Sequence, residues 1–189
     1  FCYQGGIVQN CTITGNSAGG AGGGLRFYGS GTLRNSEVSG NSAVSGGGVY
    51  CQNMDGTTSQ VQNCTVTRND GNAGGNGYGG GMYLQRTGAG LLAIQNTIIY
   101  FNIASNSPNA YNSGGVFSYC CTTPSVAGDG NITNNPSFLA AGSGYGTNCV
   151  AGNYRLQKSS ACVDTGTNQT WMTNAEDLDG NDRIYNDIV

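Results

Sequence analysis

Apolar and polar residues alternate along the chain in short runs, and this pattern predicts short β-strands. In Leu25-Arg26-Phe27 and in Cys64-Thr65-Val66 every second residue is apolar. Such alternation puts one side of each run inside the fold and the other side outside. No stripe with the 3.6-residue period of an amphipathic helix lasts long enough to predict a helix. We therefore expect an all-β fold.

The predicted strands belong to a repeat made of two phrases. The first phrase runs from Val8 to Asn16, and its later copies begin at Leu33, Val61 and Ile94. The second phrase is a Gly triplet followed by a strand-like run. Its copies alternate with those of the first phrase and begin at Gly22, Gly46, Gly79 and, in weaker form, Gly114.

The length of the repeat predicts a solenoid. Equivalent Asn residues at positions 10, 35, 63 and 96 are separated by 25, 28 and 33 residues. Repeats of this length bury their apolar faces by stacking on their neighbours. We predict a parallel β-helix with three short strands per coil over residues 1–118. An irregular, cap-like region over residues 119–189 is expected to pack on the same β-helix.

Asn recurs at two positions of the coil and predicts two ladders of stacked side chains. Asn tolerates the left-handed backbone region that a sharp corner requires, and its amide can bond locally. Equivalent amides on stacked strands can also bond one another. The first predicted ladder is Asn10, Asn35, Asn63 and Asn96. The second is Asn16, Asn41, Asn69 and Asn102.

The composition excludes two classes of partner. The chain has 34 Gly, a net charge of -3, no His, and only 9% charged residues, against about 25% in typical globular domains. It offers no basic patch for nucleic acid. No apolar run approaches the roughly 20 residues that span a bilayer. No signal peptide is present at Phe1, so any export leader is expected to have been removed.

Eight Cys in a chain of this size favour an oxidising compartment. Cys11 and Cys64 share a coil position two coils apart, or about 10 Å. A disulfide needs Cα atoms within about 7 Å, so we expect both to be buried thiols. Cys149 and Cys162 lie outside the repeat and are the predicted disulfide. For the adjacent residues Cys120 and Cys121 the sequence does not indicate a disulfide partner.

The region after the coils carries four phrases in a fixed order. They are Gly130 to Phe138, Tyr154-Arg155-Leu156, Ser160 to Gly166, and Asp177 to Arg183. Their order resembles the C-terminal part of the exported bacterial β-helix proteins called choice-of-anchor Q domain proteins. The family commonly has Pro where this chain has Ala161 and Asp182, and its Asp-Ile-Gly-Ala-Tyr-Glu phrase does not follow Val189.

The coil phrases are similar to repeats of polymorphic outer-membrane autotransporter proteins. Together the two resemblances cover nearly the whole chain. They imply a right-handed parallel β-helix that is exported and associated with a bacterial cell surface. They imply no single activity, because one fold serves many functions.

The order Asp177-x-Asp179-Gly180-Asn181 resembles the start of a Ca²⁺ loop, in which alternate oxygen side chains surround the cation. The Glu that ends a twelve-residue EF-hand loop is missing, so an EF-hand is excluded. Two interpretations remain: a looser Ca²⁺ site at Asp177, Asp179 and Asn181, or a capping turn in which Asp164 or Asp179 pairs with Arg183. We favour the capping turn.

One outward stripe combines aromatic residues with an arginine. The second position after the glycines holds Arg26, Tyr50, Tyr83 and Phe117. Aromatic faces in register can bind sugar rings or a partner's side chains. They can equally stack on one another as a surface ladder, which we favour.

Four Asn-x-Ser/Thr sequons occur, at Asn10, Asn63, Asn131 and Asn168. The first two belong to the first predicted ladder, where a glycan would break the stack. Asn131 and Asn168 are therefore the candidate acceptors if the chain is glycosylated. The alternative is that the sequons arise by chance in a chain rich in Asn and Thr.

The acids of the coil region do not predict a catalytic site. Residues 1–118 contain only Glu37, Asp55 and Asp70, and none of these is in register with another. We expect a non-catalytic, extracellular structural or adhesive protein that needs no cofactor. The alternative is a carbohydrate-binding or polysaccharide-cleaving module.

Two partners are considered for such a protein, a surface polysaccharide or the chain itself. Neither the end at Phe1 nor the end at Ile188-Val189 carries an evident polar cap. Solenoids need caps at their ends, so the chain is either a fragment or the subunit of a head-to-tail filament.

Overall fold

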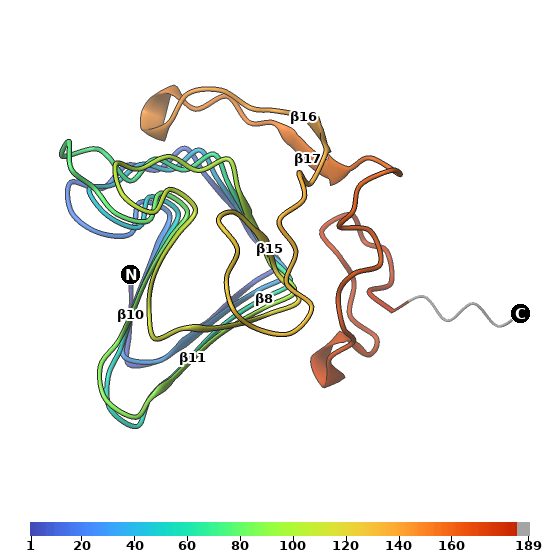
Figure 1. Cartoon of the computed structure of the whole chain (residues 1–189), viewed down its shortest axis with the longest axis horizontal. Coiled ribbons are helices and arrows are strands. Elements are labelled where there is room, and N and C mark those ends of the chain that lie inside the picture. Colours follow the sequence, from blue (N-terminus) through green and yellow to red (C-terminus); the bar gives the residue numbers. More distant parts are fainter. Residues whose placement is uncertain (185–189) are drawn as a thin grey trace, which may run out of the picture.

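The structure is a computed structural model that describes residues 1–184, and it shows a parallel β-helix with three strands per coil (Figure 1). The first sheet contains β1 (Cys2–Tyr3), β4 (Leu25–Tyr28), β7 (Val49–Asn53), β10 (Met82–Arg86) and β13 (Ala110–Ser113). The second sheet contains β2 (Ile7–Gln9), β5 (Gly31–Arg34), β8 (Thr58–Gln62), β11 (Leu91–Gln95) and β14 (Val116–Ser118). The third sheet contains β3 (Thr12–Thr14), β6 (Glu37–Ser39), β9 (Thr65–Thr67), β12 (Ile98–Tyr100) and β15 (Cys121–Thr122). The predicted fold class is confirmed.

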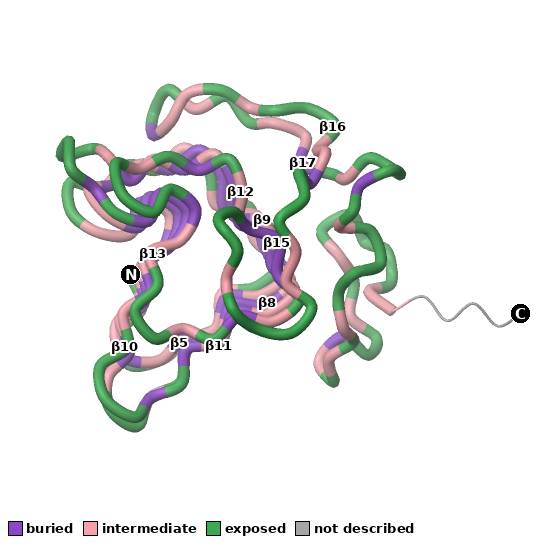
Figure 2. The backbone as a smooth tube through the Cα atoms, viewed as in Figure 1, coloured by how far each residue is buried: buried purple, intermediate pink, exposed green. Residues whose placement is uncertain are grey.

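Apolar side chains form columns inside the coil. In the third sheet, Val38, Val66 and Ile99 lie in register on neighbouring strands, and each is 0% exposed. Figure 2 shows buried residues along all three sheets. The alternation read from the sequence therefore identifies the inward face of each strand correctly.

The first Asn row forms the corner between the second and third sheets. Asn10, Asn35, Asn63 and Asn96 have φ angles of 55°, 46°, 52° and 48°, in the left-handed region that Asn tolerates better than most residues. On the last coil Tyr119 takes this position, with a φ angle of 53°. The corner explains why Asn recurs there.

A short donor side chain follows each of these corners. It donates a hydrogen bond to the carbonyl two residues earlier. The five bonds run from Cys11 to Gln9 (3.0 Å), Ser36 to Arg34 (2.8 Å), Cys64 to Gln62 (3.1 Å), Thr97 to Gln95 (2.8 Å) and Cys120 to Ser118 (3.3 Å). Cys, Ser and Thr are interchangeable there because each supplies one S–H or O–H donor of similar length.

The second Asn row is a continuous ladder, as predicted. Each side-chain oxygen accepts hydrogen bonds from the backbone N–H and the amide of the equivalent Asn one coil earlier. The donor to acceptor distances are 3.0 Å from Asn16 to Asn41, 3.0 Å from Asn41 to Asn69, and 2.9 Å from Asn69 to Asn102. The repeat analysis missed the last member, Asn109, whose oxygen accepts from Asn102 at 3.1 Å.

The Gly triplets lie where two coils approach closely. A Cβ atom at Gly47 would stand 2.3 Å from the carbonyl oxygen of Asp70, and one at Gly48 would stand 2.6 Å from that of Gly81. Such contacts are too short for any side chain. The glycines therefore let the ladder asparagines of one coil lie against the backbone of the next.

The C-terminal region lies along the outside of the coils (Figure 1). The third sheet first continues past residue 118 to β15. An antiparallel hairpin follows, formed by β16 (Phe138–Ala140) and β17 (Asn153–Leu156), with the short 3₁₀ helices η1 (Gly146–Asn148) and η2 (Thr170–Met172). No helix of the described residues is long and apolar enough to cross a membrane.

This outer segment binds the first Asn row. The Asn35 amide donates to the carbonyl of Glu176 at 2.7 Å, and the Asn96 amide donates to that of Thr167 at 2.7 Å. Within the row, hydrogen bonds join Asn35 to Asn10 (2.7 Å) and Asn96 to Asn63 (3.4 Å). In this row the predicted ladder is thus formed in part, as two hydrogen-bonded pairs. Its corner conformation turns the amides outward, where they hold the C-terminal segment.

Candidate functional site

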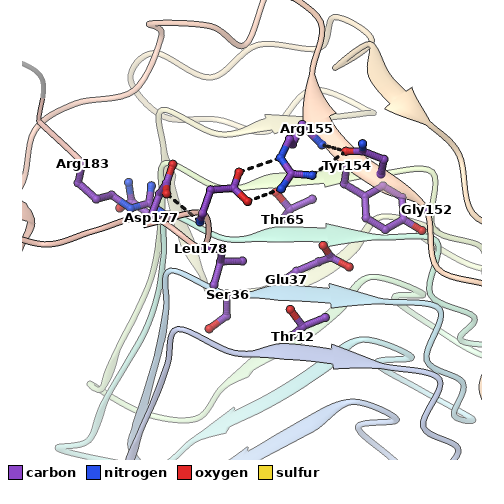
Figure 3. Close-up of a pocket in the computed structure, with 13 residues that line it drawn as sticks. Thr12, Ser36, Glu37, Thr65, Gly152, Tyr154, Arg155, Asp177, Leu178 and Arg183 are labelled. Carbon is purple, nitrogen blue, oxygen red and sulfur yellow. Dashed lines mark hydrogen bonds and ion pairs between the residues drawn. The ribbon is translucent and has the colours of Figure 1, made fainter. Parts of the chain in front are cut away.

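A large cleft lies between the third sheet and the C-terminal region (Figure 3). Its volume is about 580 Å³. Thr12, Glu37 and Thr65 lie in register on β3, β6 and β9 and form one wall. The opposite wall comes from β17 and from the loop 177–183. The cleft therefore brings together charged residues from the coils and from the C-terminal region.

The charged side chains of the C-terminal wall bind one another. Arg155 and Asp179 form an ion pair, with Nε 2.8 Å from Oδ2, and both side chains are largely exposed. The carboxylate of Asp177 accepts the backbone N–H groups of Asp179 at 2.8 Å and Asn181 at 2.9 Å. Burial alone would raise the pKa of Asp177, but these hydrogen bonds and those of the Asn181 side chain lower it.

This arrangement is a capping turn with a partner that differs from the predicted one. Asp179 pairs with Arg155 on β17, not with Arg183, because the turn packs beside the hairpin (Figure 3). Arg183 is half-buried near Asp177, and burial lowers its pKa. Over residues 1–184, no group of three His, Cys, Asp or Glu side chains is arranged to hold a metal ion.

Glu37 is the carboxylate that the coils contribute to the cleft. Its Oε1 accepts a hydrogen bond from the hydroxyl of Ser39 at 2.7 Å. Asp177 and Asp179 are held by partners of their own in the opposite wall. Each of the three carboxylates thus already binds a neighbouring group of the protein.

The aromatic stripe exists on the first sheet, but its fourth member was predicted wrongly. Arg26, Tyr50, Tyr83 and Tyr111 lie in register on β4, β7, β10 and β13. Phe117 is instead 1% exposed and lies in the second sheet beside Ile94. The weak glycine pair before Phe117 is the turn between β13 and β14, so it does not mark the start of a coil.

The rings of the stripe stack on one another. The ring centroids of Tyr50 and Tyr83 are 4.7 Å apart with planes 8° apart, and those of Tyr83 and Tyr111 are 4.6 Å apart with planes 20° apart. The Arg26 guanidinium covers Tyr50 at 5.2 Å and Phe1 at 5.5 Å. Burial raises the pKa of both Tyr50 and Tyr83. Because the ring faces already cover one another, the stripe favours the surface-ladder interpretation over sugar binding.

A second groove contains the single tryptophan and was not predicted. The groove has a volume of about 490 Å³ and lies between the second sheet and the segment 168–171. The Arg34 guanidinium lies 5.1 Å from the Trp171 ring, whose Nε1 donates to Gln169 at 2.6 Å. The amides of Gln62 and Gln169 both donate to the Oε1 of Gln95 at 3.2 Å.

The sequence contains one signal for this groove. Long polar side chains occupy the position before the corner Asn on four successive coils, and they are Gln9, Arg34, Gln62 and Gln95. Outward polar residues are ordinary on a strand, so this row was not singled out. The approach of Trp171 depends on the path of the C-terminal segment, which the repeat does not encode.

The predicted disulfide between Cys149 and Cys162 was wrong. All eight cysteines are free thiols in the described structure. The Cys149 thiol lies 3.5 Å from the hydroxyl of Thr14 on β3, whereas Cys162 lines a cavity with Cys121 of β15. Because β3 and β15 are the two edge strands of the five-stranded third sheet, these thiols lie at opposite ends of it, about 19 Å apart at the usual strand spacing.

The two candidate glycosylation sites differ in their surroundings. The Asn131 side chain accepts the backbone N–H of Cys120 at 2.9 Å and donates to the carbonyl of Phe117 at 3.3 Å. A glycan on this amide would disrupt the last coil. Asn168 is exposed at the rim of the Trp171 groove, so its side chain is accessible.

No protein-family model, curated protein or solved structure matches this chain. Of what the resemblance to exported bacterial β-helix proteins implied, the structure confirms the solenoid arrangement of three parallel sheets.

Proposed function

We propose that this chain is a non-catalytic structural or adhesive β-helix that works outside the cell. The observation that carries the proposal is the state of the charged groups in the cleft between the third sheet and the C-terminal region. Arg155 and Asp179 bind each other, Asp177 binds the backbone of its own turn, and Glu37 binds Ser39. Cleavage of a glycosidic bond needs two carboxyl groups that face the bond from roughly 5–10 Å apart.

An activity assay with two matched variants tests this proposal. The chain and its Glu37→Gln and Arg155→Gln variants are incubated with neutral and acidic polysaccharides, and new reducing ends and unsaturated products are measured. We expect no product from any of the three proteins. Turnover by the parent chain that either substitution abolishes would overturn the proposal in favour of a lyase or hydrolase.

The partner that we propose for a structural role is a second copy of the chain, stacked head to tail. Strands β1, β2 and β3 are the edge strands at one end of the three sheets, and edge strands readily pair with another chain. The net charge of -3 gives little repulsion against stacking. Electron microscopy and light scattering of the concentrated chain test this proposal, and a monodisperse monomer would contradict it.

The Trp171 groove favours carbohydrate binding as the second candidate function. An aromatic ring bordered by planar amide and guanidinium groups suits a sugar, which presents C–H groups to the ring and hydroxyls to the amides. Gln95 and Gln169 place such amides beside the ring, and Arg34 covers it from one side. Among the described residues that line this groove none is acidic, so a neutral or an acidic sugar is compatible with it.

The single tryptophan supplies a direct readout for this candidate. Because Trp171 is the only tryptophan of the chain, its fluorescence reports on this groove alone. We expect a saturable change on titration with an oligosaccharide that binds, and weaker binding by Gln95→Ala. Tyr83→Ala, on the first sheet, is the matched control and should bind normally. Unchanged fluorescence across neutral and acidic oligosaccharides would remove this candidate.

A further inference from the structure

We propose that Cys121 and Cys162 are a disulfide-forming pair that fastens the C-terminal segment to the last coil when the protein is oxidised. Cys121 lies on β15, the last strand of the third sheet, opposite Ile98. Its thiol is 3% exposed and donates a hydrogen bond to the carbonyl of Asn134 at 3.1 Å. Its neighbour Cys120 points the other way, into the core. The strand therefore separates the two adjacent cysteines, and only Cys121 faces the C-terminal region.

Cys162 is held against Cys121 by a buried serine. The Ser160 hydroxyl donates to the carbonyl of Pro136 at 2.6 Å and accepts the backbone N–H of Cys162 at 3.1 Å. The two thiols line the same cavity of about 260 Å³, and each shifts the pKa of the other. Two residues 41 positions apart in the sequence are thus already placed for a bond between their sulfur atoms.

The two thiols have different acidities. The influence of the neighbouring Cys121 thiol lowers the pKa of Cys162, and the same influence together with burial raises the pKa of Cys121. Cys162 is therefore the more acidic of the two thiols, and the thiolate is the reactive form. Cys162 is also half-buried rather than fully buried, so a small oxidant can reach it.

The oxidant that we propose is a low-molecular-weight disulfide such as oxidised glutathione. The Cys162 thiolate attacks one sulfur of this disulfide, forming a mixed disulfide and releasing one small thiolate. Cys121 then loses its proton and attacks the Cys162 sulfur, which forms the internal bond and releases the second small thiolate. The two protein thiols are oxidised, and the small disulfide takes up their two electrons and becomes two thiols.

Four of the other cysteines are poor competitors for this bond. Burial raises the pKa of Cys51 and Cys64 to about 12, and that of Cys120 to about 11. Cys149 lies at the far edge of the third sheet beside Thr14. In the described structure Cys121 is thus the cysteine that Cys162 contacts.

The test is oxidation of the folded chain followed by peptide mapping. The chain is treated with oxidised glutathione, alkylated, digested without reduction, and analysed by mass spectrometry. We expect one linked peptide pair containing Cys121 and Cys162, and a Tm higher by about 5–10 °C that returns to its starting value with dithiothreitol. Cys149→Ser is the matched control and should form the same link.

Two variants keep the proposal falsifiable. Cys162→Ser changes a half-exposed residue and should fold normally, gain no Tm on oxidation, and leave Cys121 free. Cys121→Ser, if it folds, should stop at the mixed disulfide on Cys162. The proposal is overturned if both cysteines remain alkylated as free thiols after oxidation of the folded chain, or if Cys162 links to a different cysteine.

Discussion

Asn96 and Thr167 exchange two hydrogen bonds across the outer surface of the β-helix. The Asn96 amide donates to the carbonyl of Thr167 at 2.7 Å, and the backbone N–H of Thr167 donates to the Asn96 side-chain oxygen at 2.9 Å. The Asn96 side chain thus donates one hydrogen bond to the backbone of the segment and accepts one from it, as a residue of a neighbouring β-strand does. A residue selected for its corner conformation thus also binds the C-terminal segment.

We predict that Asn96→Gly releases this segment without disturbing the coils. Gly keeps the left-handed corner and removes only the amide, so the loss should be about 1–3 kcal/mol in the stability of docking. The measurement is the rate of limited proteolysis within residues 163–184. Asn10→Gly is the control, because Asn10 bonds Asn35 and is exposed. Equal cleavage of both variants would contradict a docking role for Asn96.

We predict that Val66→Asp and Ile99→Asp prevent folding. Both side chains are 0% exposed, and an unpaired carboxylate there costs more than the stability of a typical domain. Thr65→Asp is the matched control, since Thr65 faces outward on the same strand. Expression and protease resistance are the measurements. If the Val66→Asp or Ile99→Asp protein were soluble and protease-resistant, the result would contradict the register that places both side chains inside the coil.

The sequence predicts the coils well because each coil is encoded locally. Corner, ladder and core positions repeat in order, so Val66 and Asn69 could be assigned by alignment with their neighbours. The same method failed at Phe117, because Ser107-Pro108-Asn109 replace the glycine triplet before the last first-sheet strand, and the later pair Gly114-Gly115 was taken for that triplet. Residues without a repeat partner, such as Cys162 and Trp171, could not be placed because their contacts depend on how the C-terminal chain returns to the coils.

The buried ladder should be strongest at its centre. Asn69 is 0% exposed, accepts the backbone N–H of Asn41 at 3.0 Å, and donates to the carbonyl of Val38 at 2.9 Å. Asn69→Ala removes the side-chain partner of both groups, which should cost roughly 2–6 kcal/mol at about 1–3 kcal/mol for each group. Asn16→Ala, at the exposed end of the ladder, should cost less. Denaturant unfolding of both variants measures the difference, and equal losses would contradict the ladder as a source of stability.

We expect EDTA and added Ca²⁺ to leave the melting temperature unchanged. The Asp177 carboxylate already accepts hydrogen bonds from its own turn, and Asp179 is paired with Arg155. A cation would have to displace these partners before it could bind. A higher Tm with Ca²⁺ that EDTA reverses would contradict this expectation and favour the looser Ca²⁺ site at Asp177, Asp179 and Asn181.

The turn at Asp177 should make the C-terminal region sensitive to acid. Hydrogen bonds from Asn181 and Asp179 outweigh the effect of burial and lower the pKa of Asp177 in the folded chain. A carboxyl group whose pKa is lower when folded contributes stability that is fully present above its unfolded pKa, about 3.9, and is lost as the pH falls through its folded pKa. Asp177→Asn removes the titrating group, so parent and variant should differ most near pH 7 and converge below about pH 3.9. Limited proteolysis of the C-terminal region across this range measures the gap. A gap that stays constant down to pH 3 would show that the loss comes from the shape of the side chain and not from its charge.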